Sequence, residues 1–406
     1  MGDSPSLAWF EHLCLLIDQN PTKATASIME FREQDYALEA CHSWIRTPEC
    51  SAIAQFQLAL IIQYCSLKNW SHLSPESAQA LRDTLWTLIQ NASINNTMPM
   101  YALNKLMQVF SLLWKRGWHD MEAATQRNIF TQIDALVNAT ASTQLISATS
   151  FTTGTKLLTI LIEEFESRST SEIGLPLEFH NKTHESFEKL GLSECLRLAQ
   201  LSLTRSSQQM HFNAASPQAI TETIPLVTES VRLFVEILNW TFEGCASGSQ
   251  TDLSGHQGGG KTDKRGSSLL NLPRAWAALL LSHEFLDCVF RVYTQIRGTC
   301  VQLSEMCHLA AINAPHAMNS GSDSPCQKVR ACSACLTELR LLMVSFASLS
   351  GSKFFETDGE RVTLGNAILQ AVEPMLCNAV SMGETDGAPA VAGGPKVIKN
   401  GFVNSA

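Results

Sequence analysis

Apolar side chains recur along this chain at intervals of three and four residues, the spacing that places them on one face of an α-helix. One such face consists of Leu103, Leu106, Met107, Phe110, Leu113 and Trp114. A second consists of Val231, Phe234, Val235, Leu238 and Phe242. No alternation of apolar and polar residues with a period of two is long enough to predict a strand. We therefore expect an all-α protein.

The helical segments come in pairs. The expected helices are 21–34, then 35–47 with 50–70, 74–91 with 97–118, 121–138 with 141–167, and 184–205 with 217–243. Each early pair occupies about 40 residues, which is the period of HEAT and armadillo repeats. Several second helices are apolar on more than one side, as a helix stacked between neighbours must be; the 50–70 helix carries Leu58, Ile61, Ile62 and Cys65 on one side, with Phe56 and Leu60 opposite. The sequence thus predicts a right-handed α-solenoid of HEAT-like helix pairs.

Two segments interrupt this pattern. Residues 244–271 are rich in glycine, serine and charge, and residues 379–406 are rich in glycine, alanine and proline. Such compositions bury too little apolar surface to fold, so we expect a flexible insertion and a disordered tail. This leaves a first block of repeats at 1–243 and a second at 272–378.

The segment Gly255–Thr262, GHQGGGKT, matches the letters of a phosphate-binding P-loop. A working P-loop follows a buried strand and opens a helix, so that backbone N–H groups surround the phosphates. Neither a strand before the segment nor a helix directly after it is expected here. We interpret it as part of a solvated loop, with a nucleotide hydrolase kept as the enzymatic alternative, and we expect no catalytic residue and no cofactor.

Other candidate chemistry is weaker. Cys332 and Cys335 could suggest zinc, but they lie in a helical pattern where small cysteines pack in the core, and no second ligand pair is well placed. His180 and His184 do not form an HEXXH motif, so we expect surface or loop histidines and no metal site. The net charge of −9 argues against nucleic acid and anionic membranes as partners, and no apolar stretch of 18 residues suggests a membrane span. An odd number of scattered cysteines, 13, suits a reducing compartment.

Three segments make the helix-pair interpretation more specific. Within LIEEFESRSTSEIGLPLEFH (161–180) the matching residues are Glu164, Phe165, Ile173, Gly174, Leu175, Glu178, Phe179 and His180. Within WKRGWHD (114–120) they are Lys115, Arg116, Gly117 and Trp118, and a third segment is ILNWTF (237–242). In this order the segments resemble the exportin-4 family, nuclear transport receptors of the importin-beta (karyopherin) superfamily. Weaker similarity extends from about residue 21 to 378.

The resemblance implies a non-enzymatic superhelix of HEAT repeats that shuttles between nucleus and cytoplasm. Its implied partners are the GTPase Ran in its GTP form, phenylalanine-glycine nucleoporins, and protein cargo that includes a hypusine-bearing translation factor and signalling transcription regulators. The chain holds fewer repeats than a full receptor, so we expect it to correspond to the amino-terminal part of one. The alternative is a helical-repeat scaffold for protein–protein interaction unrelated to transport.

In this superfamily Ran-GTP contacts mainly the inner helices of the amino-terminal repeats. Polar positions beside the packed faces of the 50–70 and 97–118 helices are therefore the candidate Ran surface. The expected partner-binding residues are Gln57, Tyr64, Lys68, Asn104, Gln108 and Lys115.

Overall fold

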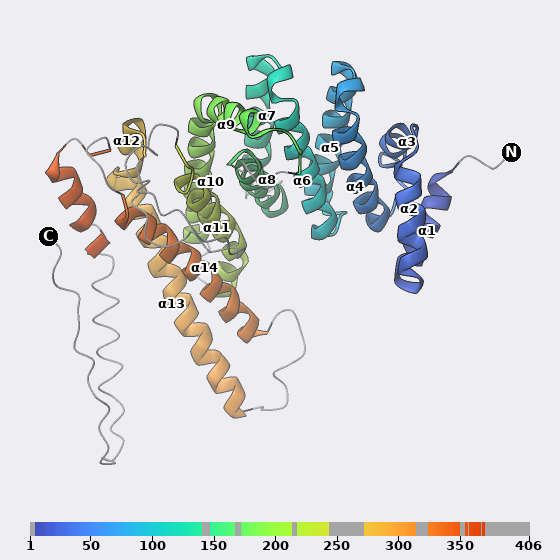
Figure 1. Cartoon of the computed structure of the whole chain (residues 1–406). Coiled ribbons are helices and arrows are strands. Elements are labelled where there is room, and N and C mark those ends of the chain that lie inside the picture. Colours follow the sequence, from blue (N-terminus) through green and yellow to red (C-terminus); the bar gives the residue numbers. More distant parts are fainter. Residues whose placement is uncertain are drawn as a thin grey trace, which may run out of the picture. The chain divides into compact units, whose positions relative to one another are not determined.

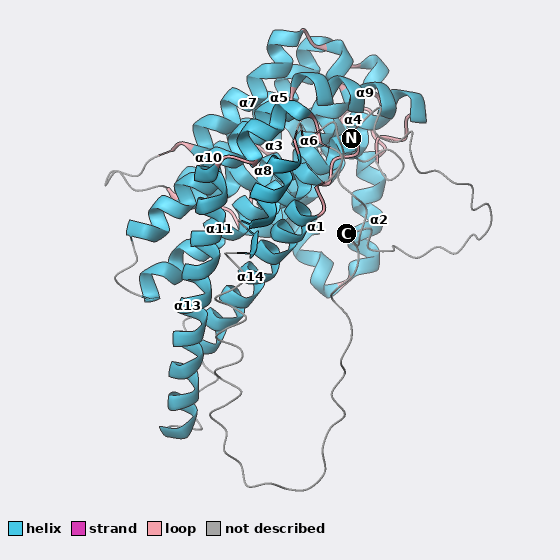
Figure 2. Cartoon of the chain, turned by 90° about the vertical axis from the view of Figure 1, so that its left-hand side faces the viewer, coloured by secondary structure: helices cyan, strands magenta, loops and turns pink. Residues whose placement is uncertain are grey.

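The computed structural model describes residues 5–139, 147–166, 172–212, 217–242, 272–313, 324–349, 354–355, 357–366 and 368–369. These residues form α-helices and short 3-10 turns, and none of them forms a strand (Figure 2), which confirms the all-α prediction. The chain divides into two compact units, Met1–Glu356 and Thr357–Ala406. In the second unit, residues 358–366 are helical. The predicted insertion at 244–271, its P-loop-like segment and the predicted tail at 379–406 all lie outside the described residues.

The helices of the first unit follow one another along the chain (Figure 1). They are α1 (Leu7–Gln19), α2 (Pro21–Arg32), α3 (Ala37–Trp44), α4 (Ala52–Lys68), α5 (Pro75–Asn95), α6 (Met100–Arg116), α7 (Ala123–Val137), α8 (Ala148–Glu166), α9 (Leu177–Leu190), α10 (Leu192–Phe212), α11 (Pro217–Leu238), α12 (Ala277–Leu280), α13 (His283–Asn313) and α14 (Pro325–Ala347). The 3-10 turns are η1 (Trp70–His72), η2 (Trp118–Asp120) and η4 (Arg274–Trp276).

These helices pack as HEAT-like pairs. The paired helices are α1 with α2, α3 with α4, α5 with α6, α7 with α8, α10 with α11, and α13 with α14. The second members also pack on one another in succession, α4 on α6, α6 on α8, α8 on α11 and α11 on α14. By contrast, α2 makes few contacts with α4. The predicted solenoid is confirmed, and its inner stack is loosest between its first two members.

Local sequence chemistry fixes several helix ends. Ser74 caps α5 by accepting a hydrogen bond from the backbone N–H of Ser77, 3.1 Å away, and Pro75 occupies the first helical position. At the other end, Asn96 adopts the left-handed conformation with φ of 50°, which asparagine tolerates better than most residues. The apolar face of α6 is buried as predicted, with Leu106 and Met107 fully inaccessible.

One expectation about helices is wrong, and one helix lies outside the expected set. The chain forms a helix before residue 21, α1, which contributes Phe10 and Leu13 to the core. The expected single helix 184–205 is two helices that meet at Gly191. A Cβ at Gly191 would lie 2.5 Å from Cζ of Phe130, so the aromatic ring of α7 occupies the space that a side chain would need. This close approach positions α9 and α10 separately against α7.

Candidate partner-binding site

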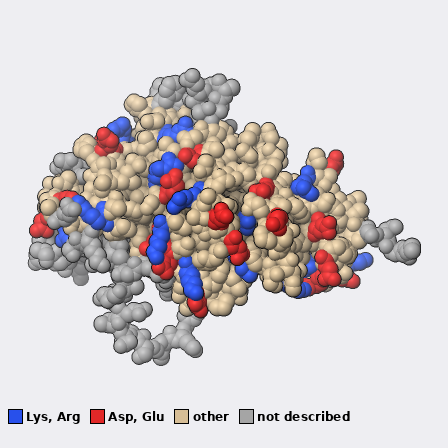
Figure 3. Space-filling view, turned by 90° about the horizontal axis from the view of Figure 1, so that it is seen from above, with Lys and Arg blue, Asp and Glu red and all other residues tan. Residues whose placement is uncertain are grey.

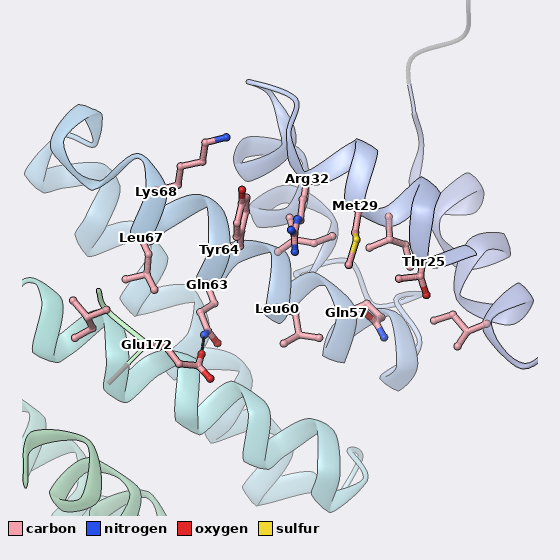
Figure 4. Close-up of a pocket in the computed structure, with 14 residues that line it drawn as sticks. Thr25, Met29, Arg32, Gln57, Leu60, Gln63, Tyr64, Leu67, Lys68 and Glu172 are labelled. Atoms are coloured by element: carbon pink, nitrogen blue, oxygen red, sulfur yellow. Dashed lines mark hydrogen bonds between the residues drawn. The ribbon is translucent and has the colours of Figure 1, made fainter. Parts of the chain in front are cut away.

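A pocket of about 640 Å³ opens between α2 and α4, where the inner stack is loosest. Figure 4 shows Thr25, Met29 and Arg32 of α2 facing Gln57, Leu60 and Tyr64 of α4. The floor is apolar, because Ile28, Leu60, Ile61 and Leu67 line it together with Met29. The pocket therefore combines an apolar floor with a polar rim, a combination typical of sites that bind other molecules.

The rim holds a small charge cluster centred on Glu33. Its carboxylate accepts hydrogen bonds from Lys68 Nζ and from the Tyr64 hydroxyl, both at 2.7 Å. The bond from Lys68 and then that from Tyr64 lower the pKa of Glu33 to about 2, while the bond to Glu33 raises the pKa of Tyr64. The guanidinium of Arg32 lies 4.1 Å from the centre of the Tyr64 ring, within the range of a cation–π interaction. At neutral pH the rim thus presents a neutral phenol and two cations around one carboxylate.

A second pocket, of about 320 Å³, lies along α6 and α8. Gln108 and Lys105 of α6 line it together with Glu163 and Glu164 of α8. Burial lowers the pKa of Lys105, and the charge of Glu172 acts in the opposite direction. This pocket is mainly polar and acidic, in contrast to the apolar floor of the first.

The two pockets adjoin, because Gln63 and Glu172 line both of them. Glu172 lies on the connection between α8 and α9, and its carboxylate accepts a hydrogen bond from Gln63 Nε2 (dashed in Figure 4). Gln63 itself is only 8% exposed, so this contact lies on the floor of the site. We call the two pockets together the inner groove.

The structure brings four of the predicted partner-binding residues to the inner groove. Gln57, Tyr64 and Lys68 line the first pocket and Gln108 lines the second. Asn104 is half-buried and lines neither pocket, and its Oδ1 has no hydrogen-bond partner. The stripe predicted on α4 is therefore accessible along its whole length, whereas the stripe predicted on α6 is accessible only in part.

The expectation that Lys115 is accessible to a partner is wrong. This side chain is fully buried, and its Nζ donates to the backbone carbonyl of Glu164 and lies 3.4 Å from the carboxylate of the same residue. Burial lowers the pKa of Lys115, and Glu164 partly offsets that effect. The error has a simple cause: α8 packs against α6 and covers a face that the pattern of α6 alone marks as polar.

Several residues of the groove are missing from the sequence prediction. Glu33 is 31 residues from Tyr64, and Glu172 is 109 residues from Gln63, so no local pattern links the members of either pair. Arg32 and Glu33 carry a partial signal, because they end α2 as Lys68 ends α4, and opposite charges at the same end of neighbouring helices can pair. Gln63 carries no such signal in the sequence, because a polar residue on an apolar helix is ordinarily assigned to the solvated side.

The two histidines and two cysteines singled out in the sequence are core residues. Cys332 and Cys335 are buried on α14, as the helical pattern predicts. His180 and His184 are buried on α9, which corrects the expectation of surface or loop positions. Within the described ranges, no three His, Cys, Asp or Glu side chains come together in a way that could hold a metal ion. Among the described helices, none is both long and apolar enough to cross a membrane.

The three segments that carry the family resemblance meet in one aromatic cluster. Trp118 contacts Phe165 with ring centres 4.9 Å apart, and Phe165 stacks on Phe187 at 4.2 Å. Trp240 stacks on His184 at 4.2 Å, and the same histidine bonds a carboxylate of α8. The cluster joins η2, the end of α8, α9 and the end of α11. The three segments, far apart in the sequence, therefore contribute side chains to one packed core.

Acidic and basic side chains alternate over the face of the molecule seen in Figure 3, with no broad basic patch on that face. An electrostatic surface for nucleic acid would require such a patch. On this face the molecule offers mixed charge, which suits specific contacts with proteins better than binding to a polyanion.

Comparison with known proteins agrees with the architecture. The family model of Exportin-4 matches residues 11–314. Exportin-4 of Dictyostelium discoideum is 22% identical over 256 residues, a match that covers 61% of this chain and 22% of that protein. The chain thus spans about a fifth of the length of this relative. On the match over residues 11–314, together with the stacked helix pairs and the cluster that joins the three segments, the chain belongs to the Exportin-4 family.

Proposed function

We propose that this chain is a non-enzymatic nuclear transport receptor that binds Ran in its GTP form through the inner groove. Family membership supports the class of function, and one observation supports the location. That observation is that Gln57, Tyr64, Lys68 and Gln108, chosen from the sequence as the Ran surface, line two adjoining pockets on successive inner helices.

The ion pair on the rim can be replaced by an ion pair with a protein partner. Lys68 is 49% exposed and Glu33 is 44% exposed, so water and salt screen their ion pair and it contributes little to folding. A carboxylate of a protein partner can therefore replace Glu33 on Lys68 at little cost in free energy. The apolar floor beneath would supply the rest of the contact by excluding water from the partner's apolar side chains.

The remaining partners follow from the family alone. They are protein cargo, including a hypusine-bearing translation factor and signalling transcription regulators, and phenylalanine-glycine nucleoporins. A receptor with these partners shuttles between nucleus and cytoplasm. A solenoid can couple the binding of such partners, because GTPase and cargo both favour particular curvatures of the same helix stack.

Titration calorimetry with Ran loaded with GTP or GDP tests the proposal. The chain should bind the GTP form, and the triple variant Tyr64→Phe/Lys68→Ala/Gln108→Ala should bind it at least tenfold more weakly, or about 1.4 kcal/mol. Tyr64→Phe removes the hydroxyl but keeps the ring beneath Arg32. The matched control is Glu185→Ala/Lys189→Ala, which removes an exposed ion pair on α9 and should leave affinity unchanged.

Equal affinity for both nucleotide states would overturn the proposal and favour a scaffold unrelated to transport. An unchanged affinity in the triple variant would remove the inner groove from the Ran surface. The hydrolase alternative is tested separately: nucleotide turnover by the chain, abolished on deleting residues 245–268, would establish the P-loop.

A further inference from the structure

Two residues that follow α8 lie where the two pockets of the inner groove meet. Glu172 and Ile173 come after α8 in the sequence and reach back to α4, where Glu172 meets Gln63, 109 residues away. Glu172 lines both pockets and Ile173 lines the first. We call Glu172 and Ile173 the strap. Any molecule that spans both pockets must cross the place where the strap lies.

Side-chain contacts of both residues hold the strap in the groove. The Glu172 carboxylate accepts a hydrogen bond from Gln63 Nε2, and Ile173 is buried to 7% exposure while lining the same pocket as Leu60 and Leu67. Glu172 itself remains exposed, and so does Gly174, which follows with a φ of 68°. That left-handed conformation favours glycine and closes a turn directly after the two contacts. The strap is thus a turn that presents a carboxylate and a branched aliphatic side chain.

The groove is complementary to this pair of groups. Gln63 supplies an amide donor on the floor, and Lys105 lies close enough for its ammonium to interact with the Glu172 charge. Leu60 and Leu67 supply the adjoining apolar surface. A donor and a cation beside an aliphatic surface form a receptor for a carboxylate next to a branched side chain, whichever chain carries them.

We propose that the strap is an internal stand-in for a protein partner, and that the partner binds the inner groove through a turn bearing a carboxylate followed by a branched aliphatic residue. The inference rests on the proposed function for the location of the partner site. Because the strap belongs to the same chain, it stays in the groove until a partner with additional contacts replaces it. Partner and strap compete for Gln63 and Lys105.

The test uses the full chain and a peptide of residues 172–176, Glu-Ile-Gly-Leu-Pro, blocked at both ends and carrying a fluorophore. In fluorescence anisotropy, the variant Glu172→Ala/Ile173→Ala should bind the peptide at least tenfold more tightly than the unmodified chain. The matched control is Leu177→Ala/Glu178→Ala, which removes an aliphatic and an acidic side chain that are both exposed at the start of α9. This control should behave like the unmodified chain, and a peptide with glutamine for glutamate and alanine for isoleucine should not bind.

Equal affinity of the unmodified chain and the strap variant for the peptide would overturn the inference, and so would no binding to a strap variant that retains its helical circular dichroism. If that variant does not fold, amide hydrogen exchange in the unmodified chain tests the competition instead. In the unmodified chain, saturating peptide should raise amide hydrogen exchange at residues 173–175, and unchanged exchange there would refute competition. Neither readout contains Ran, so failure of Ran binding and failure of the strap are separate results.

Discussion

Replacing Lys115 tests how the inner helices are joined. Lys115 lies in the last turn of α6 and is fully buried, with Nζ donating to the backbone carbonyl of Glu164. Glu164 lies at the end of the described part of α8, which reaches Glu166, and carbonyl groups near a helix end commonly accept hydrogen bonds from outside the helix. Lys115 therefore caps α8 from a neighbouring helix.

The expected losses differ between two substitutions. Lys115→Ala removes the donor, the cation beside a carboxylate that is 19% exposed, and the packed four-carbon stem, so we expect a loss of about 3–5 kcal/mol in unfolding free energy. Lys115→Met keeps most of the stem and removes only the ammonium. The Glu164 carbonyl then lacks the donor that Lys115 supplies, which costs about 1–3 kcal/mol. The difference between the two variants measures packing, and the loss in the methionine variant measures the cap together with the ion pair to the Glu164 carboxylate.

Urea unfolding followed by circular dichroism at 222 nm gives both values. The control is Lys182→Ala, which removes a cation that is 65% exposed and paired with Glu178 on α9, and should cause no measurable change. If Lys115→Ala is no more destabilising than this control, the ammonium is hydrated and the cap does not exist. Equal losses in the alanine and methionine variants would assign the whole effect to the charged group.

Three further predictions follow from the described contacts. Gly191→Ala should lower unfolding free energy by about 1–3 kcal/mol in urea denaturation, because its Cβ would lie 2.5 Å from Phe130. The folded-state pKa of Glu33, about 2, lies below its ordinary value of 4.5, so its stabilising effect is present above pH 4.5 and disappears as the pH falls toward 2. Because the pair with Lys68 is exposed, the melting temperature of Glu33→Gln should lie only slightly below that of the unmodified chain at pH 6, and the two should converge near pH 2. His184→Ala should cost about 2–4 kcal/mol in the same denaturation assay, and His184→Phe clearly less, because phenylalanine loses the hydrogen bond to α8 but keeps the stacking on Trp240.

Helix pairing could be predicted from the sequence because each inner helix encodes its buried faces locally. Leu58, Ile61, Ile62 and Cys65 are all buried, as their spacing requires. The break at Gly191 could not be predicted in this way. Its cause is a ring on α7, 61 positions earlier in the chain, and periodicity within one segment contains no information about such a neighbour.

Some features of the site could likewise be predicted from one helix, whereas others depend on residues far away in the sequence. Tyr64 and Lys68 are four residues apart on one helix, so a surface stripe could be predicted from spacing. Their common partner Glu33 lies on another helix, and Glu172 lies two repeats further along the chain. The prediction for Lys115 is wrong because this position is polar in the pattern of α6 but is covered by α8. Only the stacking of repeats decides which polar stripe remains exposed.

The contacts on either side of the strap explain how it can be displaced without unfolding the repeats. Before it, the end of α8 is held by the Lys115 cap and by Glu166, whose carboxylate bonds His184 at 2.8 Å and the backbone N–H of Thr241 at 3.3 Å. After it, α9 is held by Phe187, which is fully buried in the aromatic cluster. Between these anchors, the hydrogen bond from Gln63, the nearby charge of Lys105 and the buried side chain of Ile173 all hold the strap. The anchors of α8 and α9 thus use other residues than the strap does, so we expect competition for the groove to be local.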